Sequence, residues 1–283
     1  MKRVAPLLLL FLTVMISGCQ DAASEVASED GTDLSVCKSH SDLAHQAMNA
    51  PPHHTLIFLD QSSSVDENGV SDEYSNMIRK RVEEDLPNHG SILELVMVHS
   101  RTTGRAGALK AVQEIPLPRE ENFLDETKLG CNQYVSSIGI MLRETWNAIE
   151  KRLETPYVND ANRKATDLWG VFEVASISFA DGPDDAVRSV YVFSDMLECM
   201  SGSDRRCFER TPPAGKMQAE TWAEADASHL PEILHIDRDI LSQVNFYFVM
   251  GRHSLNDATR NVHYYWRALL RNLGVPEKQI HFL

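Results

Sequence analysis

The stretch Leu56-Ile57-Phe58-Leu59-Asp60-Gln61-Ser62-Ser63-Ser64 decides the fold. Its four apolar residues are typical of a short strand that is buried on both faces, as in a parallel sheet with helices on each side. An aspartate ends the apolar run, and hydroxyls follow at alternate positions. At the carboxyl end of a buried strand, Asp60, Ser62 and Ser64 would point three hard oxygen ligands into the crevice where open α/β sheets bind ligands. Taken alone, the pattern favours a turn and a helix cap.

Two later stretches supply support for a ligand site. Residues Arg188 to Asp195 form a second β-rich run that ends in an aspartate, and residues Thr166 to Ala175 place a threonine just before a predicted helix. In this order, the three fragments resemble the metal-ion-dependent adhesion site of von Willebrand factor type A domains. The resemblance spans about Thr55 to Leu283, although only these short motifs are specific.

The resemblance implies a divalent cation, Mg²⁺ or Mn²⁺, at a site made by Asp60, Ser62, Ser64, Thr166 and Asp195. In the family's arrangement the two serines bind directly, the two aspartates act largely through hydrogen bonds or water, and the threonine binds directly in the ligand-ready state. One position stays open for a Glu or Asp of a partner protein. The chain departs from the family at Met196, where Gly is usual, and Glu198 is close enough in sequence to close the site as an internal ligand.

The rest of the chain alternates strand and helix patterns, which predicts an α/β fold with a Rossmann-like open, mostly parallel sheet and helices on both faces. The predicted strands are Thr55–Leu59, Ile92–Val98, Ala111–Ile115, Ser189–Phe193, Asn245–Met250 and Gln279–Phe282. The predicted helices are Ser71–Asp85, Tyr134–Leu153, Leu168–Phe179 and Leu255–Leu273, the last followed by Gly274 and Pro276 as stop signals.

These elements form one predicted domain, residues 51–283, with insertions near 119–163 and 198–237. The insertions precede the Thr166 loop and follow Asp195, so both flank the proposed site. Residues that bind a partner often lie on loops held by a rigid scaffold, so these two insertions are the candidate partner-binding surface. The alternative is that both insertions are solvent-exposed additions to the domain that bind no partner.

The amino terminus predicts export and lipidation. Residues 1–18 form a short signal with Lys2 and Arg3 before an apolar run, and the sequence ending at Cys19 resembles the lipobox of bacterial lipoproteins. The resemblance implies that Cys19 is lipidated and that residues 19–50 include a flexible acidic tether. Gln20 after the cysteine favours the outer membrane, facing the periplasm. Ordinary secretion with a free Cys19 thiol is the alternative.

The net charge bears on which partners the chain can bind, and the number of cysteines bears on its disulfides. Removing residues 1–18 leaves 265 residues and moves the formal charge from −14 to −16. Binding to nucleic acid or to anionic lipid headgroups requires a basic face, and the net charge of this chain is strongly negative. We therefore expect no nucleic-acid partner, and membrane contact only through the lipid on Cys19.

Four cysteines remain after Cys19, and an even number in an exported chain suggests disulfides. The expected pairs are Cys199–Cys207 and Cys37–Cys131. A zinc site is the rival interpretation, although no paired Cys or His spacing supports it.

Enzymatic interpretations find less support. A phosphoaspartate site would have a second Asp where the chain has Ser62, and no G-x-S-x-G run predicts a serine hydrolase. His53 and His54 lie at the far end of the first strand, where we expect exposed loop residues. The sequence therefore predicts a non-enzymatic, metal-dependent binding module on the cell envelope. A metal-dependent hydrolase or phosphatase using the same crevice, and a structural envelope lipoprotein without a working metal site, are the alternatives.

Overall fold

The computed structural model of the chain describes residues 50–60, 72–105, 108–116, 127–154, 165–200, 205–250 and 261–283. Within these ranges, no helix has both the length and the apolar character that crossing a membrane requires. The predicted signal, Cys19, Cys37 and most of the tether lie outside the described residues, as do Ser62 and Ser64.

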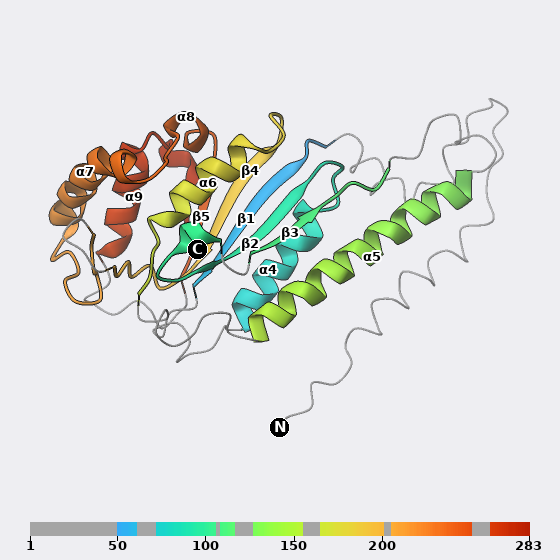
Figure 1. Cartoon of the computed structure of the whole chain (residues 1–283), viewed down its shortest axis with the longest axis horizontal. Helices are drawn as coiled ribbons and strands as arrows, with labels where there is room; N and C mark the ends of the chain where they lie inside the picture. Colours follow the sequence, from blue (N-terminus) through green and yellow to red (C-terminus); the bar gives the residue numbers. More distant parts are fainter. Residues whose placement is uncertain are drawn as a thin grey trace, which may run out of the picture. The chain divides into compact units, whose positions relative to one another are not determined.

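The centre of the domain is a six-stranded sheet (Figure 1). Its strands are β1 (His53–Asp60), β2 (Ile92–Val98), β3 (Leu109–Val112), β4 (Val187–Phe193), β5 (Asn245–Val249) and β6 (Ile280–Phe282). They lie in the order β3-β2-β1-β4-β5-β6, and all neighbouring pairs are parallel except β2 with β3. The predicted open, mostly parallel α/β sheet is therefore confirmed.

Helices cover both faces of this sheet, as predicted (Figure 1). They are α4 (Asp72–Asp85), α5 (Thr127–Glu154), α6 (Gly170–Ala180), α7 (Lys216–Ile233), α8 (Arg238–Leu241) and α9 (Val262–Asn272). α4 and α5 pack on one face, α6 and α9 pack on the other, and α7 packs against α9. In β1, Leu56 and Phe58 belong to the α6 side, whereas Ile57 and Leu59 belong to the α4 side. Burial on both faces is the reason for the continuous apolar run.

Several helices and strands begin or end at residues other than those predicted from the sequence. β3 begins two residues earlier than predicted, because Leu109 and Ala111 pair with Leu95 and Leu93 of β2 in an antiparallel register. The helix α5 begins at Thr127 rather than Tyr134. α9 ends at Asn272, and Gly274 follows with a φ of +99°, so the predicted glycine stop signal is confirmed.

The helix α7 was not predicted at all, and it lies within the insertion near 198–237. Its buried side chains are Ala219, Ala223, Ala227 and Leu230, which repeat every three or four residues on one face. Small alanine side chains let this helix pack closely against α9, but they give little hydrophobic contrast in the sequence. The insertion is therefore part of the packed domain and not a loop alone.

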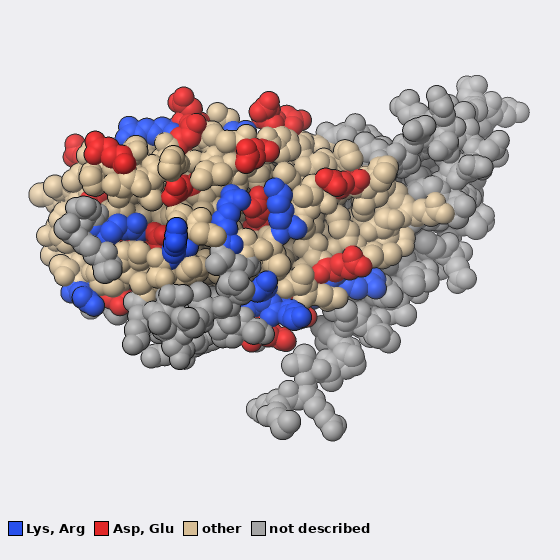
Figure 2. All heavy atoms as spheres, in the orientation of Figure 1, with Lys and Arg blue, Asp and Glu red and all other residues tan. Residues whose placement is uncertain are grey.

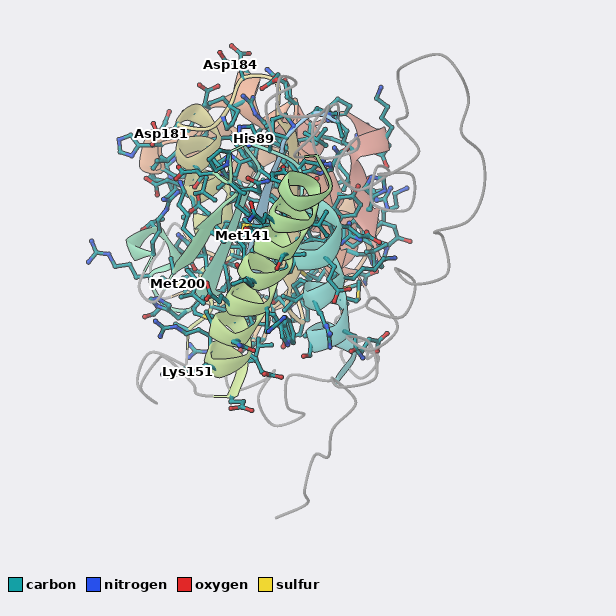
Figure 3. All side chains as sticks on the ribbon, turned by 90° about the vertical axis from the view of Figure 1, so that its right-hand side faces the viewer. His89, Met141, Lys151, Asp181, Asp184 and Met200 are labelled. Carbon is teal, nitrogen blue, oxygen red and sulfur yellow. A yellow bond between two sulfur atoms is a disulfide. The ribbon has the colours of Figure 1, made fainter. Side chains whose placement is uncertain are left out.

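The two ends of the sheet can be followed in Figure 3. His89, which precedes β2, and Asp181 and Asp184, which precede β4, lie at the top of that view, whereas Lys151 near the end of α5 lies at the bottom. The top is thus the amino end of the parallel strands, and the carboxyl ends lie opposite. On the face shown in Figure 2, Lys and Arg lie in small groups beside Asp and Glu.

Candidate functional site

The strand order brings the two predicted aspartates to one place. The chain runs from β1 to β2 on one side and later returns to place β4 on the other side, so the order reverses between β1 and β4. Asp60 is the last residue of β1, and Asp195 follows β4 by two residues. The carboxyl ends of strands at such a reversal form the usual ligand crevice of open α/β sheets.

Asp60 is held by a neighbour that is not among the predicted site residues. Its Oδ2 accepts a 2.6 Å hydrogen bond from Ser194 Oγ, and both residues are buried. The same serine oxygen accepts a 2.9 Å hydrogen bond from the backbone N–H of Met196. Ser194 therefore fixes the first aspartate and the start of the loop that carries Asp195. No sequence signal marks it, because its role depends on the pairing of β4 with β1.

The loop after β4 turns sharply at Met196, which has a φ of +65°. This left-handed conformation favours glycine, the residue that the resemblance leads us to expect here, and a side chain in it is strained by about 1–2 kcal/mol. Met196 is nevertheless well anchored. Its side chain is buried in the core, and its carbonyl accepts a 2.9 Å hydrogen bond from Trp266 Nε1. The packing of the Met196 side chain and the hydrogen bond to its carbonyl thus offset the backbone strain, and the chain still makes the turn that positions Asp195.

Thr166 lies on a loop that pairs with the segment after β4. Its backbone exchanges two 3.0 Å hydrogen bonds with that of Cys199, an isolated antiparallel bridge. The residue is 1% exposed, and within the described part of the chain its Oγ1 has no hydrogen-bond partner. A buried hydroxyl without a partner costs about 1–3 kcal/mol. The Thr166 hydroxyl oxygen is therefore free to bind a ligand at this edge of the sheet.

The amino terminus of α6, directly after Thr166, is capped by two buried carboxylates. Asp167 accepts a 3.0 Å hydrogen bond from Gly170 N, the first residue of the helix. Glu198 accepts from the backbone N–H groups of Leu168 and Trp169 at 2.6 and 3.2 Å. These acceptors satisfy the N–H groups that a helix leaves unpaired at its start, where negative charge is also favoured.

Arg205 contacts both of these acidic side chains. Its guanidinium lies 2.5 Å from Asp167 Oδ1 and 2.5 Å from Glu198 Oε1, and it also covers the ring of Trp169. Burial raises the pKa of Glu198 to about 8, against the lowering influence of Arg205. The helix terminus and Arg205 take up both carboxylate oxygens of Glu198, so its contacts do not support the expected role as an internal metal ligand.

The loop itself is closed by the predicted Cys199–Cys207 disulfide, which is confirmed. The bridge joins the strand-like segment that pairs with Thr166 to the next segment, where Met200 N donates to Arg206 O. Arg205 lies inside this closed loop. The pairing of Cys37 with Cys131 stays a prediction, since Cys37 lies outside the described residues and the side chain of Cys131 is not described.

The expectation of exposed histidines before the first strand is wrong for His54. Both His53 and His54 belong to β1, because β4 extends the ladder to His53. His54 is 1% exposed, with Nε2 3.4 Å from Glu94 Oε1 and its ring edge-on to Phe179. This pair lies at the amino end of the strand, away from Asp60, so it takes no part in the candidate site.

The donors at the carboxyl end fit a hard cation. The described part of the site offers the carboxylates of Asp60 and Asp195 and the unpartnered hydroxyl of Thr166. Oxygen donors of this kind suit Mg²⁺ and Mn²⁺ and not the softer metals that prefer thiolate or imidazole. Asp195 is half-buried, and its Oδ1 already accepts a 3.0 Å hydrogen bond from Leu197 N, which fixes its orientation.

Comparisons with known proteins do not assign a family to the chain. No family model and no curated protein matches the chain. Three similar solved structures are proximal thread matrix protein 1 from the mussel byssus, the pilus adhesin SpaC from Lactobacillus rhamnosus GG and an aerotolerance-related membrane protein from Bacteroides fragilis. Their identities are 13%, 8% and 14%, and their TM-scores are 0.41, 0.40 and 0.32. They cover 82%, 83% and 81% of this chain, which spans 43%, 28% and 90% of their own lengths. Likenesses at this level carry no conclusion about function.

Proposed function

We propose that the chain is a von Willebrand factor type A-like domain that binds a protein partner through a divalent cation, and that it is anchored to the bacterial envelope by a lipid on Cys19. The residues that would hold the cation are Asp60, Ser62, Ser64, Thr166 and Asp195. When bound, Mg²⁺ or Mn²⁺ would supply an open coordination position for a carboxylate of the partner. We expect no catalysis.

The observation that carries the proposal is the buried, unpartnered Oγ1 of Thr166. A folded chain that keeps such an oxygen without a hydrogen bond sacrifices stability, and a bound ion is one explanation for such an atom. The two aspartates at the same edge of the sheet add the negative charge that a cation offsets. Asp60 would act through the network that Ser194 already holds, and Asp195 through an orientation fixed by the backbone of its own loop.

The test compares Thr166→Val with the wild type in the presence and absence of Mg²⁺. Valine has nearly the same shape without the unpaired oxygen, so the metal-free variant should be as stable as the wild type, or more stable by up to about 1 kcal/mol. A ligand bound only by the folded state adds about 2.7 kcal/mol at a hundredfold excess over its dissociation constant. The variant should lose most of that increment, measured by urea unfolding with and without Mg²⁺.

Thr55→Val is the matched control. Thr55 is also buried in β1, but its Oγ1 donates a 2.9 Å hydrogen bond to Asp85 Oδ2 near the amino end of the sheet. We expect this variant to lose about 1–3 kcal/mol and to keep the full Mg²⁺ increment. Equal Mg²⁺ increments in the wild type and Thr166→Val would refute the proposed site. Asp60→Ala is a poorer test, since it also removes the acceptor of Ser194.

A further inference from the structure

A short turn follows the disulfide and presents a carboxylate. The carbonyl of Cys207 accepts a 2.9 Å hydrogen bond from Thr211 N, which closes the turn. Phe208 is buried, and its ring lies edge-on to Tyr265 with centroids 4.7 Å apart. Glu209 follows directly and is exposed. The backbone of Glu209 is therefore fixed by a covalent bridge two residues before it and by a core aromatic residue next to it.

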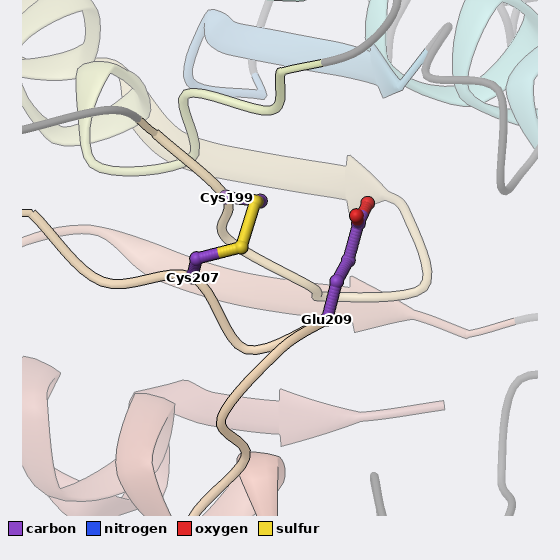
Figure 4. A group of neighbouring side chains, drawn as sticks. All are labelled: Cys199, Cys207 and Glu209. Carbon is purple, nitrogen blue, oxygen red and sulfur yellow. A yellow bond between two sulfur atoms is a disulfide. The ribbon is translucent and has the colours of Figure 1, made fainter.

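The side chain of Glu209 points back toward the candidate site. One of its carboxylate oxygens and the sulfurs of Cys199 and Cys207 all lie within 4.8 Å of one another. Figure 4 shows the carboxylate beside the carboxyl end of β4, the strand that Asp195 follows. Partial burial raises the pKa of Glu209, and the charge of Asp195 adds to the rise. The charges of the two carboxylates thus repel each other, and a cation between them would offset that repulsion.

Thr166 borders the same space. Residues that exchange both hydrogen bonds in an antiparallel pair carry their side chains on one face, with Cβ atoms about 4.5–5.5 Å apart. Thr166 and Cys199 form such a pair, so the Thr166 side chain lies on the face that holds the disulfide and Glu209. The unpartnered Oγ1 of Thr166, a residue that is 1% exposed, thus lies on the face that the Glu209 carboxylate also reaches.

We infer that Glu209 is the chain's own ligand for the open position of the cation site, so that the site is closed until a carboxylate of the partner displaces it. This inference rests on the proposed function and adds its regulation. Among the carboxylates of this loop, Glu198 is committed to the start of α6, whereas Glu209 is exposed and its carboxylate lies beside the carboxyl end of β4. An internal ligand lowers the apparent affinity for a partner by the fraction of time that it occupies the position, which sets a threshold for binding.

The test uses Mn²⁺ as the probe on the whole chain. Bound Mn²⁺ is counted by electron paramagnetic resonance, and its exchangeable waters are read from the relaxation rate of water protons. In Glu209→Gln, water should replace the lost carboxylate, and the relaxivity per bound ion should rise about 1.5-fold, as for two waters becoming three in a six-coordinate shell. Acetate, a stand-in for the partner's carboxylate, should reverse that rise and should act more weakly on the wild type.

Two further variants separate the effect of the length of the Glu209 side chain from the effect of its charge. Glu209→Asp keeps the charge on a shorter side chain and should also raise the relaxivity. Glu224→Gln removes an exposed charge from α7 and should behave as the wild type does. Equal relaxivity and equal acetate response in the wild type and Glu209→Gln would overturn the role of Glu209 but leave the cation site standing. Absence of bound Mn²⁺ in the wild type would overturn the proposed function and this inference with it.

Discussion

Arg205 offers the sharpest test of how the loop after β4 is held together. Its guanidinium contacts Asp167 and Glu198, whose side chains are 6% and 0% exposed. Arg205→Met keeps an apolar stem over the ring of Trp169 but removes the positive charge. The variant leaves the buried Asp167 carboxylate without its partner, and above the raised pKa of Glu198 it leaves two carboxylates facing each other; the loss of one partner is most costly in such an arrangement.

The size of the effect follows from burial. Removing one partner of a buried ion pair costs about 3–5 kcal/mol, because the remaining charge is desolvated without compensation. For a domain of this length, each kcal/mol shifts the melting temperature by about 2–4 °C, so we expect a fall of about 6–20 °C. At pH 9, adding Glu198→Gln removes the ionisable carboxyl beside Asp167 and should restore part of the loss, by about 0.5–3 kcal/mol of coupling.

The loss should also depend on pH. Burial raises the pKa of Glu198 from its usual 4.5 to about 8, and Arg205 opposes that rise. Between these two values the folded carboxyl keeps a proton that the unfolded one has released, so stability falls as the pH rises, by up to about 1.4 kcal/mol per unit. Without Arg205 the upper limit of this window moves higher. The cost of Arg205→Met should therefore be smaller at pH 5 than at pH 9.

Urea unfolding at pH 5, 7 and 9 measures these free energies directly. Arg206→Met is the matched control, since Arg206 forms a comparable pair with Asp226 at 2.7 Å and lies over Trp222, but Asp226 is 12% exposed and its charge can be hydrated. Its loss should be smaller and nearly independent of pH. A cost below about 0.5 kcal/mol for Arg205→Met at pH 9, or an equal cost at pH 5 and pH 9, would refute the reasoning.

Three further predictions concern other parts of the chain. Replacing Cys199 and Cys207 with Ala should cost about 2.5 kcal/mol for a loop with a sequence separation of 8, and equal unfolding midpoints under oxidising conditions would contradict this. Gly182→Ala should cost about 1–3 kcal/mol by urea unfolding, because the new Cβ would lie 2.3 Å from Nδ1 of the buried His54; an unchanged midpoint would argue against that contact. Labelled palmitate should enter the wild type but not Cys19→Ser, and an unlabelled wild type would rule out the lipid anchor.

The parts of the fold that the sequence predicts are those with a local signal. β1 and β2 are buried on both faces, so their apolar runs are visible without knowing their neighbours. The glycine stop after α9 is local in the same sense. By contrast, α7 buries mainly alanines, and the reason for their burial is the surface of α9, which lies tens of residues later in the chain. A helix defined by its partner leaves a weak pattern in its own sequence.

The residues of the candidate site also fall into those that a local sequence pattern predicts and those whose role depends on contacts between distant segments. The aspartates and Thr166 follow recognisable runs, whereas Ser194 acquires its role only because β4 pairs with β1 and brings it to Asp60. Met196 shows the converse case, since sequence reasoning expects Gly at a left-handed turn. A methionine is tolerated there because the core fills around its side chain, and that compensation cannot be seen in a five-residue motif.

The two glutamates of the loop show why distance along the chain is a poor guide to which carboxylate reaches the site. Glu198 is only three residues from Asp195, and sequence proximity alone favours it as an internal ligand. The start of α6 offers unpaired N–H groups at the same place, and a carboxylate that satisfies them, with Arg205 beside it, is held too strongly to turn elsewhere. Glu209 lies further along the chain, but the disulfide reverses the backbone and returns it to the end of β4. The choice between the two is therefore made by a helix terminus and a covalent bridge, neither of which belongs to the metal motif.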